Sequence, residues 1–564
     1  MDAGSPSIAL MTSLDTLLRL GLGDRIKAVA ILHAPSSSRP LSQALPSNHD
    51  TILIGLIHNP QTAYRLIDHG PSADEEDKDK SLEFRDFWGE KAELRRFKDG
   101  RIQESVVWDV KSIDERAHIP GMIVLHLLNR HFGVTADKVQ TWQSSFDSML
   151  RLPEAVSSIY LASGIAVGAK GAITAFDGLV KQFKALDDDL PLALSSVSPV
   201  SEQLRYTNVF GPVPLPSSLA QSMPPNARYI TPISIVLEFE KSSKWPDDLK
   251  AIQKIKLAFF ERIATALMAA VVGLRARVVI GDGVSTSDII DQAFVEIVTP
   301  DGWAFEARIW HSREATLLDR IIEHKVNRLP HVMTKVQDEK QGKEYKEALE
   351  AKELYIRRFI HAPRHHRVIA SLNHQYSPFA GTVRLVKRWL ASHWLLHGHV
   401  SEEAVEILCA SLFIGNGRHV GIEPDTKVDE RASIPGSKER GFASVIAFLK
   451  DWKWEEGLSV PLYGKDASIL LDGLRPRSST QGVWRLSTEL DKEGYVWSSH
   501  GPDAVVAHRI KELAKATWAC LEGMEQGVLE VKVDLLLSWS CTSIFTKLLC
   551  HSKYSCTPQM ITMS

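Results

Sequence analysis

The stretch ISIVLEFEKSSKWPDDLKAIQKIKLAFFERIATAL, residues 233–267, decides the fold class of this chain. Its first seven residues, Ile233–Phe239, are rich in Ile, Val and Phe, a composition that favours a strand. Pro246 suits the first turn of a helix, and apolar side chains then recur at helical spacing at Ile252, Ile255, Phe259, Ile263 and Leu267. The stretch therefore predicts a strand followed by a long helix that begins at Pro246.

Similar patterns surround this stretch. Upstream, an amphipathic helix is predicted from the spacing of Phe176, Leu179, Val180, Phe183 and Leu186. Downstream, two strands, 292–298 and 303–310, flank a turn at Pro300-Asp301-Gly302. The order helix, strand, helix, strand, strand indicates a mixed α+β domain.

The rest of the chain divides into two further blocks and a tail. In the block before about residue 150, we predict a strand at 51–57, a helix at 62–68, a hairpin within 87–108 that turns at Asp99-Gly100, and helices at 121–131 and 136–149. In the block after residue 319, helices are predicted near 337–354, 381–396, 402–413, 441–452 and 503–521. Residues 526–564 are rich in Ser, Thr and Cys, and we expect an aberrant or disordered tail there.

The composition limits the possible functions. The 564 residues include 44% hydrophobic and 24% charged side chains, enough to bury several cores. Sixty-six Lys and Arg oppose 69 Asp and Glu, so any contact with RNA is expected to be a local patch and not a basic coat. The five cysteines lack the spacing of a zinc site, so we predict no bound metal. The sequence has no cofactor motif, so we predict no cofactor. It also has no apolar run of about 18 residues, so we predict no membrane span.

Three long stretches together resemble the Nrap family of nucleolar RNA-associated proteins, which includes the U3 small nucleolar RNA-associated subunit of the small-subunit processome. They are FRDFWGEKAELRRFKDGRIQESVVW at 84–108, FEKSSKWPDDLKAIQKIKLAF at 239–259 and FAGTVRLVKRWLASHWL at 379–395. The resemblance covers roughly residues 10–525. It corresponds to the middle and later part of a typical family member.

The resemblance implies an α+β multidomain fold. A small α/β domain at 10–150 would end a first module, a degenerate nucleotidyltransferase-like domain would occupy 171–318, a helical domain like those of poly(A) polymerase and oligoadenylate synthetase would occupy 319–525, and the tail would be 526–564. The implied function is a non-catalytic RNA- and protein-binding scaffold subunit of the small-subunit processome. It would reside in the nucleus and nucleolus and act in pre-rRNA processing and small ribosomal subunit biogenesis. Its implied partners are pre-rRNA, U3 small nucleolar RNA and other processome proteins.

Three glutamates stand where an active nucleotidyltransferase would hold two metal ions. Glu238 and Glu240 alternate along one strand and can share a face, and Glu306 lies on a later strand. The phosphate-binding turn should lie near 195–201, yet Pro199 lacks an N–H there and no glycine permits close backbone approach. We therefore predict a degraded acidic site. The alternative is an active template-independent RNA nucleotidyltransferase that uses the three glutamates.

Cations in two helical-block segments are candidates for RNA contact. In TVRLVKRWLASHW, the cations Arg384, Lys387 and Arg388 flank an apolar stripe, and the alternative is a core helix whose basic stems lie over its neighbours. The segment RRFIHAPRHHR contributes Arg357, Arg358, Arg364 and Arg367. It is interpreted either as a phosphate-binding loop or as ordinary solvated surface.

A third cationic segment lies in the predicted hairpin. Lys91, Arg95 and Arg96 are candidate RNA ligands there, although neighbouring acids such as Glu90 and Glu93 offer intramolecular salt bridges instead. The near-neutral net charge also leaves open a pure protein–protein adaptor without affinity for RNA.

Overall fold

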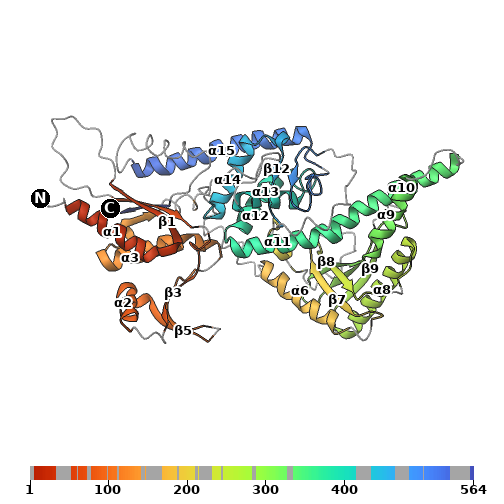
Figure 1. Ribbon diagram of the computed structural model, residues 1–564, viewed down its shortest axis with the longest axis horizontal. Helices are drawn as coiled ribbons and strands as arrows, with labels where there is room; N and C mark the ends of the chain where they lie inside the picture. The colour runs from red at the N-terminus through yellow and green to blue at the C-terminus, as the bar shows by residue number, and fades with distance from the viewer. Residues whose placement is uncertain are drawn as a thin grey trace.

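The computed structural model places most of the chain in three regions (Figure 1). The residues it describes are 6–33, 52–59, 61–72, 78–97, 100–110, 113–141, 147, 168–186, 190–209, 212, 214, 231–242, 245–281, 287–326, 335–414, 434–463, 482–499, 501–533 and 559–563. Within those ranges, no helix combines the length and the apolar surface that crossing a lipid bilayer requires.

The middle region is built on a five-stranded sheet. Its elements are α6 (Gly168–Lys184), β7 (Leu194–Pro199), β8 (Ile233–Phe239), α8 (Leu249–Ala270), β9 (Arg275–Ile280), β10 (Ala293–Val298), β11 (Ala304–Trp310), α9 (Arg313–Val326) and α10 (Lys335–Tyr355). The strand order is β7-β8-β11-β10-β9. Only the central pair, β8 and β11, is parallel. The predicted mixed α+β character is confirmed, and three of the five strands are those predicted from the sequence.

The central strand β8 owes its position to its composition. Its odd-numbered residues from Ile233 to Phe239 are buried, and they pack in one core with α6 and α8. Helix α8 begins three residues later than predicted, at Leu249, because the Asp248 carboxylate accepts a hydrogen bond from the backbone N–H of Ala251 (2.7 Å) and caps the helix. Pro246 therefore precedes the helix.

Helices α9 and α10 belong to the same apolar core as the sheet. Leu317 and Leu318 of α9, together with Ala348, Ala351 and Tyr355 of α10, are buried within it. A six-residue π-helical segment, Ile356–His361, then connects α10 to α11 without a break, and the two helices form one long bent rod (Figure 1). The core of the sheet region therefore extends through α10 as far as Phe359.

The third region is mainly helical. It contains α11 (Ala362–Gln375), α12 (Phe379–Ser392), α13 (Glu402–Phe413), α14 (Lys438–Asp451), the short paired strands β12 (Leu458–Ser459) and β13 (Leu486–Ser487), and α15 (Ala504–Val533). Its core is separate from that of the sheet region. Helix α13 is buried along nearly its whole length, while α15 lies along the outside beside α14 (Figure 1).

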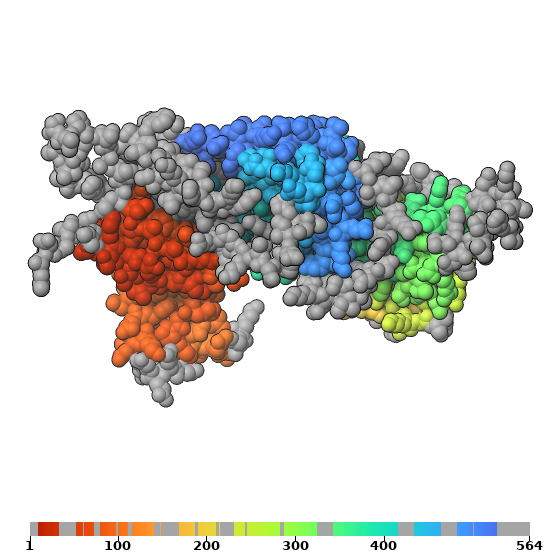
Figure 2. All heavy atoms as spheres, turned by 45° about the horizontal axis from the view of Figure 1, so that its top comes forward, coloured from red at the N-terminus to blue at the C-terminus, as the bar shows by residue number. Residues whose placement is uncertain are grey.

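The N-terminal region forms a lobe of its own, seen in red and orange in Figure 2. It contains α1 (Pro6–Leu22), β1 (Ile26–His33), β2 (Ile52–His58), β3 (Ile67–Ser72), α2 (Lys78–Trp88), β4 (Ala92–Arg96), β5 (Ile102–Val107), α3 (Ile119–Phe132) and β6 (Val139–Thr141). The predicted hairpin is confirmed as β4 and β5, which pair antiparallel. Ser437, the N-cap of α14, donates a hydrogen bond to Asp147 (3.0 Å) and joins this region to the helical one.

Two predictions in this block were wrong. Residues 62–68 form a turn that leads into β3, since Ile67 and Asp68 pair with β5. The start of the predicted helix 136–149 is a single 3-10 turn followed by β6, and its remainder lies almost entirely outside the described residues. Within residues 526–564, the described parts are the end of α15, which extends to Val533, and β14 (Gln559–Met563), which pairs with β2 and β6; the prediction of an aberrant or disordered tail stays a prediction. Residues 534–558 lie outside the described residues.

Candidate functional site

The three glutamates of the predicted acidic site do not converge. The parallel register of β11 and β8 sets Glu306 opposite Ser234, four residues before Glu238. Four residues of extended strand correspond to roughly 13 Å. Glu240 follows the end of β8 and is exposed. Among the described residues, no three His, Cys, Asp or Glu side chains gather as a potential metal site.

Glu238 and Glu306 each have a local partner instead. The Ser196 hydroxyl on β7 donates to Glu238 (2.9 Å), and Arg308 Nε donates to Glu306 (2.8 Å). Both partners are on the same or the adjacent strand, and both carboxylates are half-buried. These glutamates behave as polar positions on a sheet surface and do not point at a shared centre.

The segment expected to cradle a phosphate is used for pairing and capping. Residues up to Pro199 form the edge strand β7, where a proline is tolerated because its missing N–H faces away from the sheet. The backbone N–H of Val200 still donates to Ser234 O (3.2 Å). Ser201 then caps a short 3-10 helix, Glu202–Arg205, through its side chain. The Val200 N–H and the Ser201 side chain therefore already have partners within the fold.

The same 3-10 helix carries Arg205 into the helical region. Arg205 Nε lies 3.1 and 3.0 Å from the two carboxylate oxygens of Glu406 on α13, and Arg205 Nη1 donates to Val200 O (2.6 Å). The Thr207 hydroxyl donates to Glu406 at 2.5 Å. Residues about 200 positions apart in sequence are thus joined directly.

Two further groups complete this site around Glu406. Lys387 Nζ on α12 lies 2.8 Å from Glu406 Oε1, and His365 Nε2 on α11 lies 2.6 Å from Glu406 Oε2. We call the five residues Arg205, Thr207, His365, Lys387 and Glu406 the Glu406 cluster. The Glu406 and Lys387 side chains are 0% exposed. One buried carboxylate on α13 therefore receives donors from two other helices, α11 and α12, and from the sheet region.

Electrostatics explain why these charges persist without water. Burial alone would raise the pKa of Glu406, but Arg205, Lys387 and His365 together hold it well below its usual range. Burial opposes the charge on Lys387, yet Glu406 and Glu402 raise its pKa. A buried ion pair of this kind persists only when its geometry and hydrogen bonds are nearly complete, and removing one member leaves an uncompensated charge. The Glu406 cluster thus joins the sheet region to the helical region and exposes no face to a substrate.

One predicted RNA ligand is corrected by this cluster. Lys387 cannot offer its ammonium group to a phosphate, because the side chain is fully buried between Glu406 and Glu402. Its neighbours on α12 differ: Arg388 is exposed and Arg384 is half-buried. The helix therefore combines a core role with one free cationic position.

The segment Arg357–Arg367 is helical throughout and does not form the predicted loop. Two of its arginines are used internally, since Arg357 lies over the Trp497 ring (5.3 Å) and Arg358 Nη1 donates to Asp291 O (2.7 Å). Arg364 and Arg367 instead line a cavity of about 530 Å³. Two of the predicted cations therefore border a concave surface.

The hairpin cations have mixed surroundings. Lys91 Nζ lies over the Trp108 ring at 5.7 Å, and Arg95 pairs with Glu93 at 2.5 Å, as the salt-bridge alternative anticipated. Arg96 is exposed. Of the three, Arg96 offers the least encumbered cation.

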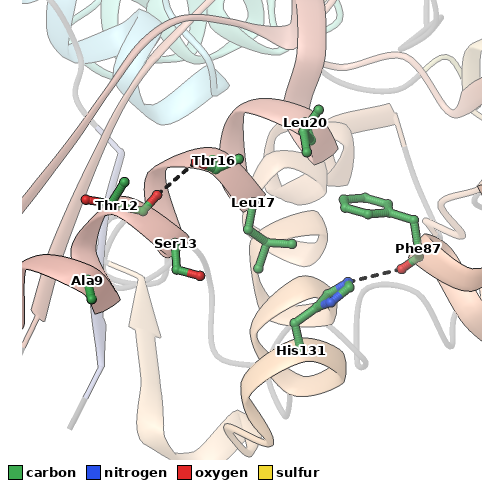
Figure 3. Close-up of a pocket in the computed structure, with 8 residues that line it drawn as sticks. All are labelled: Ala9, Thr12, Ser13, Thr16, Leu17, Leu20, Phe87 and His131. Carbon is green, nitrogen blue, oxygen red and sulfur yellow. Dashed lines mark hydrogen bonds between the residues drawn. The ribbon is translucent and has the colours of Figure 1, made fainter. Parts of the chain in front are cut away.

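A second cavity, of about 630 Å³, lies on the N-terminal region (Figure 3). Helix α1 forms one wall with Thr16, Leu17 and Leu20, and Phe87 and His131 face them across it. His131 Nε2 lies 3.2 Å from Phe87 O. With a single imidazole and no charged side chain in its lining, this groove does not resemble a phosphate site.

Sequence reasoning missed Arg205, His365 and Glu406. A signal for Glu406 was present, because EEAVEILCASLF places this glutamate between Val405 and Ile407 in an otherwise apolar helix. A glutamate in such surroundings is almost never buried without a partner. Nothing local identified the partners.

The fold and site define a class first: a nucleotidyltransferase-like domain joined to a helical domain of the poly(A) polymerase and oligoadenylate synthetase kind. Three family models match the chain in succession: Nrap protein domain 3 at residues 1–133, Nrap protein nucleotidyltransferase domain 4 at 145–374, and Nrap protein PAP/OAS1-like domain 5 at 376–538. The chain belongs to the Nrap family. The division of the sequence into domains at 10–150, 171–318, 319–525 and 526–564 stays a prediction.

Curated relatives agree with this assignment. U3 small nucleolar RNA-associated protein 22 of Schizosaccharomyces pombe is 29% identical over 92% of this chain and 43% of its own length. The protein of the same name from Saccharomyces cerevisiae is 28% identical over 86% of this chain and 36% of its own length. Nucleolar protein 6 of Homo sapiens is 27% identical over 92% of this chain and 43% of its own length. The chain spans less than half the length of these relatives.

Proposed function

We propose that this chain is a non-catalytic, RNA- and protein-binding part of the nucleolar small-subunit processome. It acts in pre-rRNA processing and small ribosomal subunit biogenesis, with pre-rRNA, U3 small nucleolar RNA and other processome proteins as partners. The names of the relatives support the nucleolar setting and the association with U3 small nucleolar RNA. The family's nucleotidyltransferase domain supplies the fold without a requirement for its chemistry.

One observation carries the non-catalytic part of the proposal. The strand register separates Glu306 from Glu238 by four residues, whereas two-metal catalysis requires carboxylates that share ions about 4 Å apart. The edge segment that would hold a triphosphate is also committed to the sheet and, through Arg205, to Glu406. These features favour a scaffold over a transferase.

A nucleotide-incorporation assay tests this part. The purified chain is incubated with labelled NTPs, Mg²⁺ or Mn²⁺ and RNA ends, beside a Glu240→Ala variant and an active poly(A) polymerase as the positive control. We expect no extension by either form of the chain. Template-independent addition by the unmodified chain that Glu240→Ala abolishes would overturn the proposal and restore the transferase alternative.

Binding to RNA needs a separate test against the adaptor alternative. Affinity for a labelled single-stranded RNA is measured by fluorescence anisotropy from about 50 to 200 mM salt, because a protein that contacts phosphates releases counterions and weakens steeply over that range. We expect a log–log slope of about −2 to −4, from a few local contacts in a chain of net charge −3. A flat salt response, or no binding at low salt, would favour a pure protein–protein adaptor.

A further inference from the structure

One face of α11 lines a cavity. Arg364, Arg367, Ser371 and Gln375 follow one another along this face at intervals of three or four residues, as neighbours on one side of a helix do. Both Ser371 and Gln375 are exposed. The cavity of about 530 Å³ falls within the range that small-molecule and nucleotide sites occupy. We call it the α11 pocket.

The rest of the lining is mostly apolar and aromatic. Tyr376 and Tyr463 border the pocket together with Leu462 and Leu490. Tyr463 is fixed in place, since its hydroxyl lies 3.2 Å from His365 Nδ1, and His365 is itself held by Glu406. The lining of the pocket therefore combines two arginines with tyrosine rings that suit the flat face of a base.

The cationic side lacks a counter-charge. In the part of the chain that the structure describes, neither Arg364 nor Arg367 forms an ion pair, and Arg364 Nη1 is buried without a hydrogen-bond partner. Burial lowers the pKa of Arg364, and the like charge of Arg367 lowers it further. The nearby carboxylate of Glu489 forms no ion pair with either arginine among the described residues, and its Oε2 accepts the backbone N–H groups of Leu462 and Tyr463 (2.9 Å each). Two arginines in this arrangement gain stability from an anion placed between them.

We infer that the α11 pocket binds one nucleotide unit of single-stranded RNA, with its phosphate between Arg364 and Arg367 and its base against the wall formed by Tyr376, Tyr463 and Leu490. This inference rests on the proposed RNA-binding function and gives it a location. A single strand is required, because a base stacked within a duplex cannot enter a concave pocket. Arginine suits the phosphate, since its planar guanidinium donates two parallel hydrogen bonds to such oxygens.

The test compares three variants of the full chain with the unmodified protein. Arg364→Gln/Arg367→Gln removes both charges but retains long polar side chains, and Ser371→Glu places a negative charge on the pocket face without touching the core. Arg320→Gln, at an exposed position of α9 that was not a candidate RNA ligand, is the matched control. Affinities for a labelled single-stranded oligonucleotide and for duplex RNA are measured by anisotropy, and thermal unfolding verifies that each variant is folded.

We expect both pocket variants to lose about tenfold or more in affinity for the single strand, and the control to change by less than about threefold. The salt slope should fall by about one for each lost phosphate contact. A 4-thiouridine oligonucleotide should crosslink to the peptide that contains Tyr463 or Tyr376.

Each contrary outcome separates the pocket from the general function. Equal losses in all three variants, or none in the pocket variants, overturn the α11 pocket while RNA binding elsewhere stands. Absence of RNA binding by the unmodified chain overturns the proposed RNA-binding function and the pocket with it. Competition by polyglutamate as effective as that by RNA would identify an acidic peptide as the occupant, against this inference.

Discussion

The central strands of the sheet and the Glu406 cluster both contain glutamates, yet these glutamates differ in burial and in the number of their partners. Glu238 and Glu306 lie on neighbouring strands, are partly exposed, and each accepts from one nearby side chain. Glu406 is fully buried and receives four different side chains. The glutamate that matters most for the stability of this fold is therefore the one that joins two regions. The resemblance to nucleotidyltransferases pointed to other glutamates.

The largest effect should follow from emptying the cluster. Glu406→Ala leaves Arg205 and Lys387 buried without their main counter-charge, so the free energy of unfolding should fall by about 3–5 kcal/mol. Guanidinium unfolding followed by both fluorescence and circular dichroism measures this loss. A decrease below 1 kcal/mol would show that the Glu406 cluster is not the main contact that stabilises the two regions against each other.

The next largest effect should be a difference in stability between variants of two adjacent cations on α12, Lys387 and Arg388. Lys387→Met should cost roughly 3 kcal/mol because Glu406 and Glu402 lose a buried partner, whereas Arg388→Met should change stability by less than about 0.5 kcal/mol. The pair is matched in helix position and in the residue introduced. Equal losses for both variants in the same denaturation experiment would contradict the burial of Lys387.

A pH series should sharpen the comparison further. Burial lowers the pKa of His361 and of His366 to about 4, so both rings stay neutral in the folded protein while the unfolded chain protonates near 6.5. The unfolded state then binds more protons, and stability must fall as the pH drops from about 6.5 towards 4. Between pH 6.5 and 5.5 we expect a loss of about 2 kcal/mol from the two residues together.

The control for this series is His366→Gln, measured by denaturation at each pH. It should reduce the loss between pH 6.5 and 5.5 by about 1 kcal/mol, because the contribution of one titrating ring is gone. A loss of unchanged size would assign the pH dependence to other groups.

The smallest effects belong to the two glutamates on the central strands of the sheet. Glu238→Gln and Glu306→Gln should each alter the free energy of unfolding by less than about 1 kcal/mol, since Ser196 still donates to the remaining amide oxygen and the Arg308 pair is partly solvated. Thermal unfolding by calorimetry, with Glu406→Ala in the same series, provides the scale. Losses comparable to that of Glu406→Ala would erase the contrast between the two sites.

Local patterns predicted the elements but not their long-range contacts. The composition of Ile233–Phe239 and the Asp99-Gly100 turn predicted β8 and the β4–β5 hairpin, because strand burial and turn chemistry are encoded within a few residues. The helix predicted at 62–68 failed since strand pairing with β5 overrode the local pattern. Lys387 was misread because a lysine on a helix is normally solvated, and its burial depends on α13 packing against α12. No local pattern links Arg205 to Glu406 across 201 positions.

The joint between α11 and α12 has a consequence for how this protein can be dissected. The family models divide the sequence between residues 374 and 376, which assigns Arg205 and His365 to one segment and Glu406 to the other. A fragment cut there would leave an acidic side chain stranded in an apolar helix bundle, with a lysine as its one remaining cationic neighbour from the cluster. The two segments that the family models separate are therefore expected to depend on each other for stability. Expression trials should carry both segments on one polypeptide.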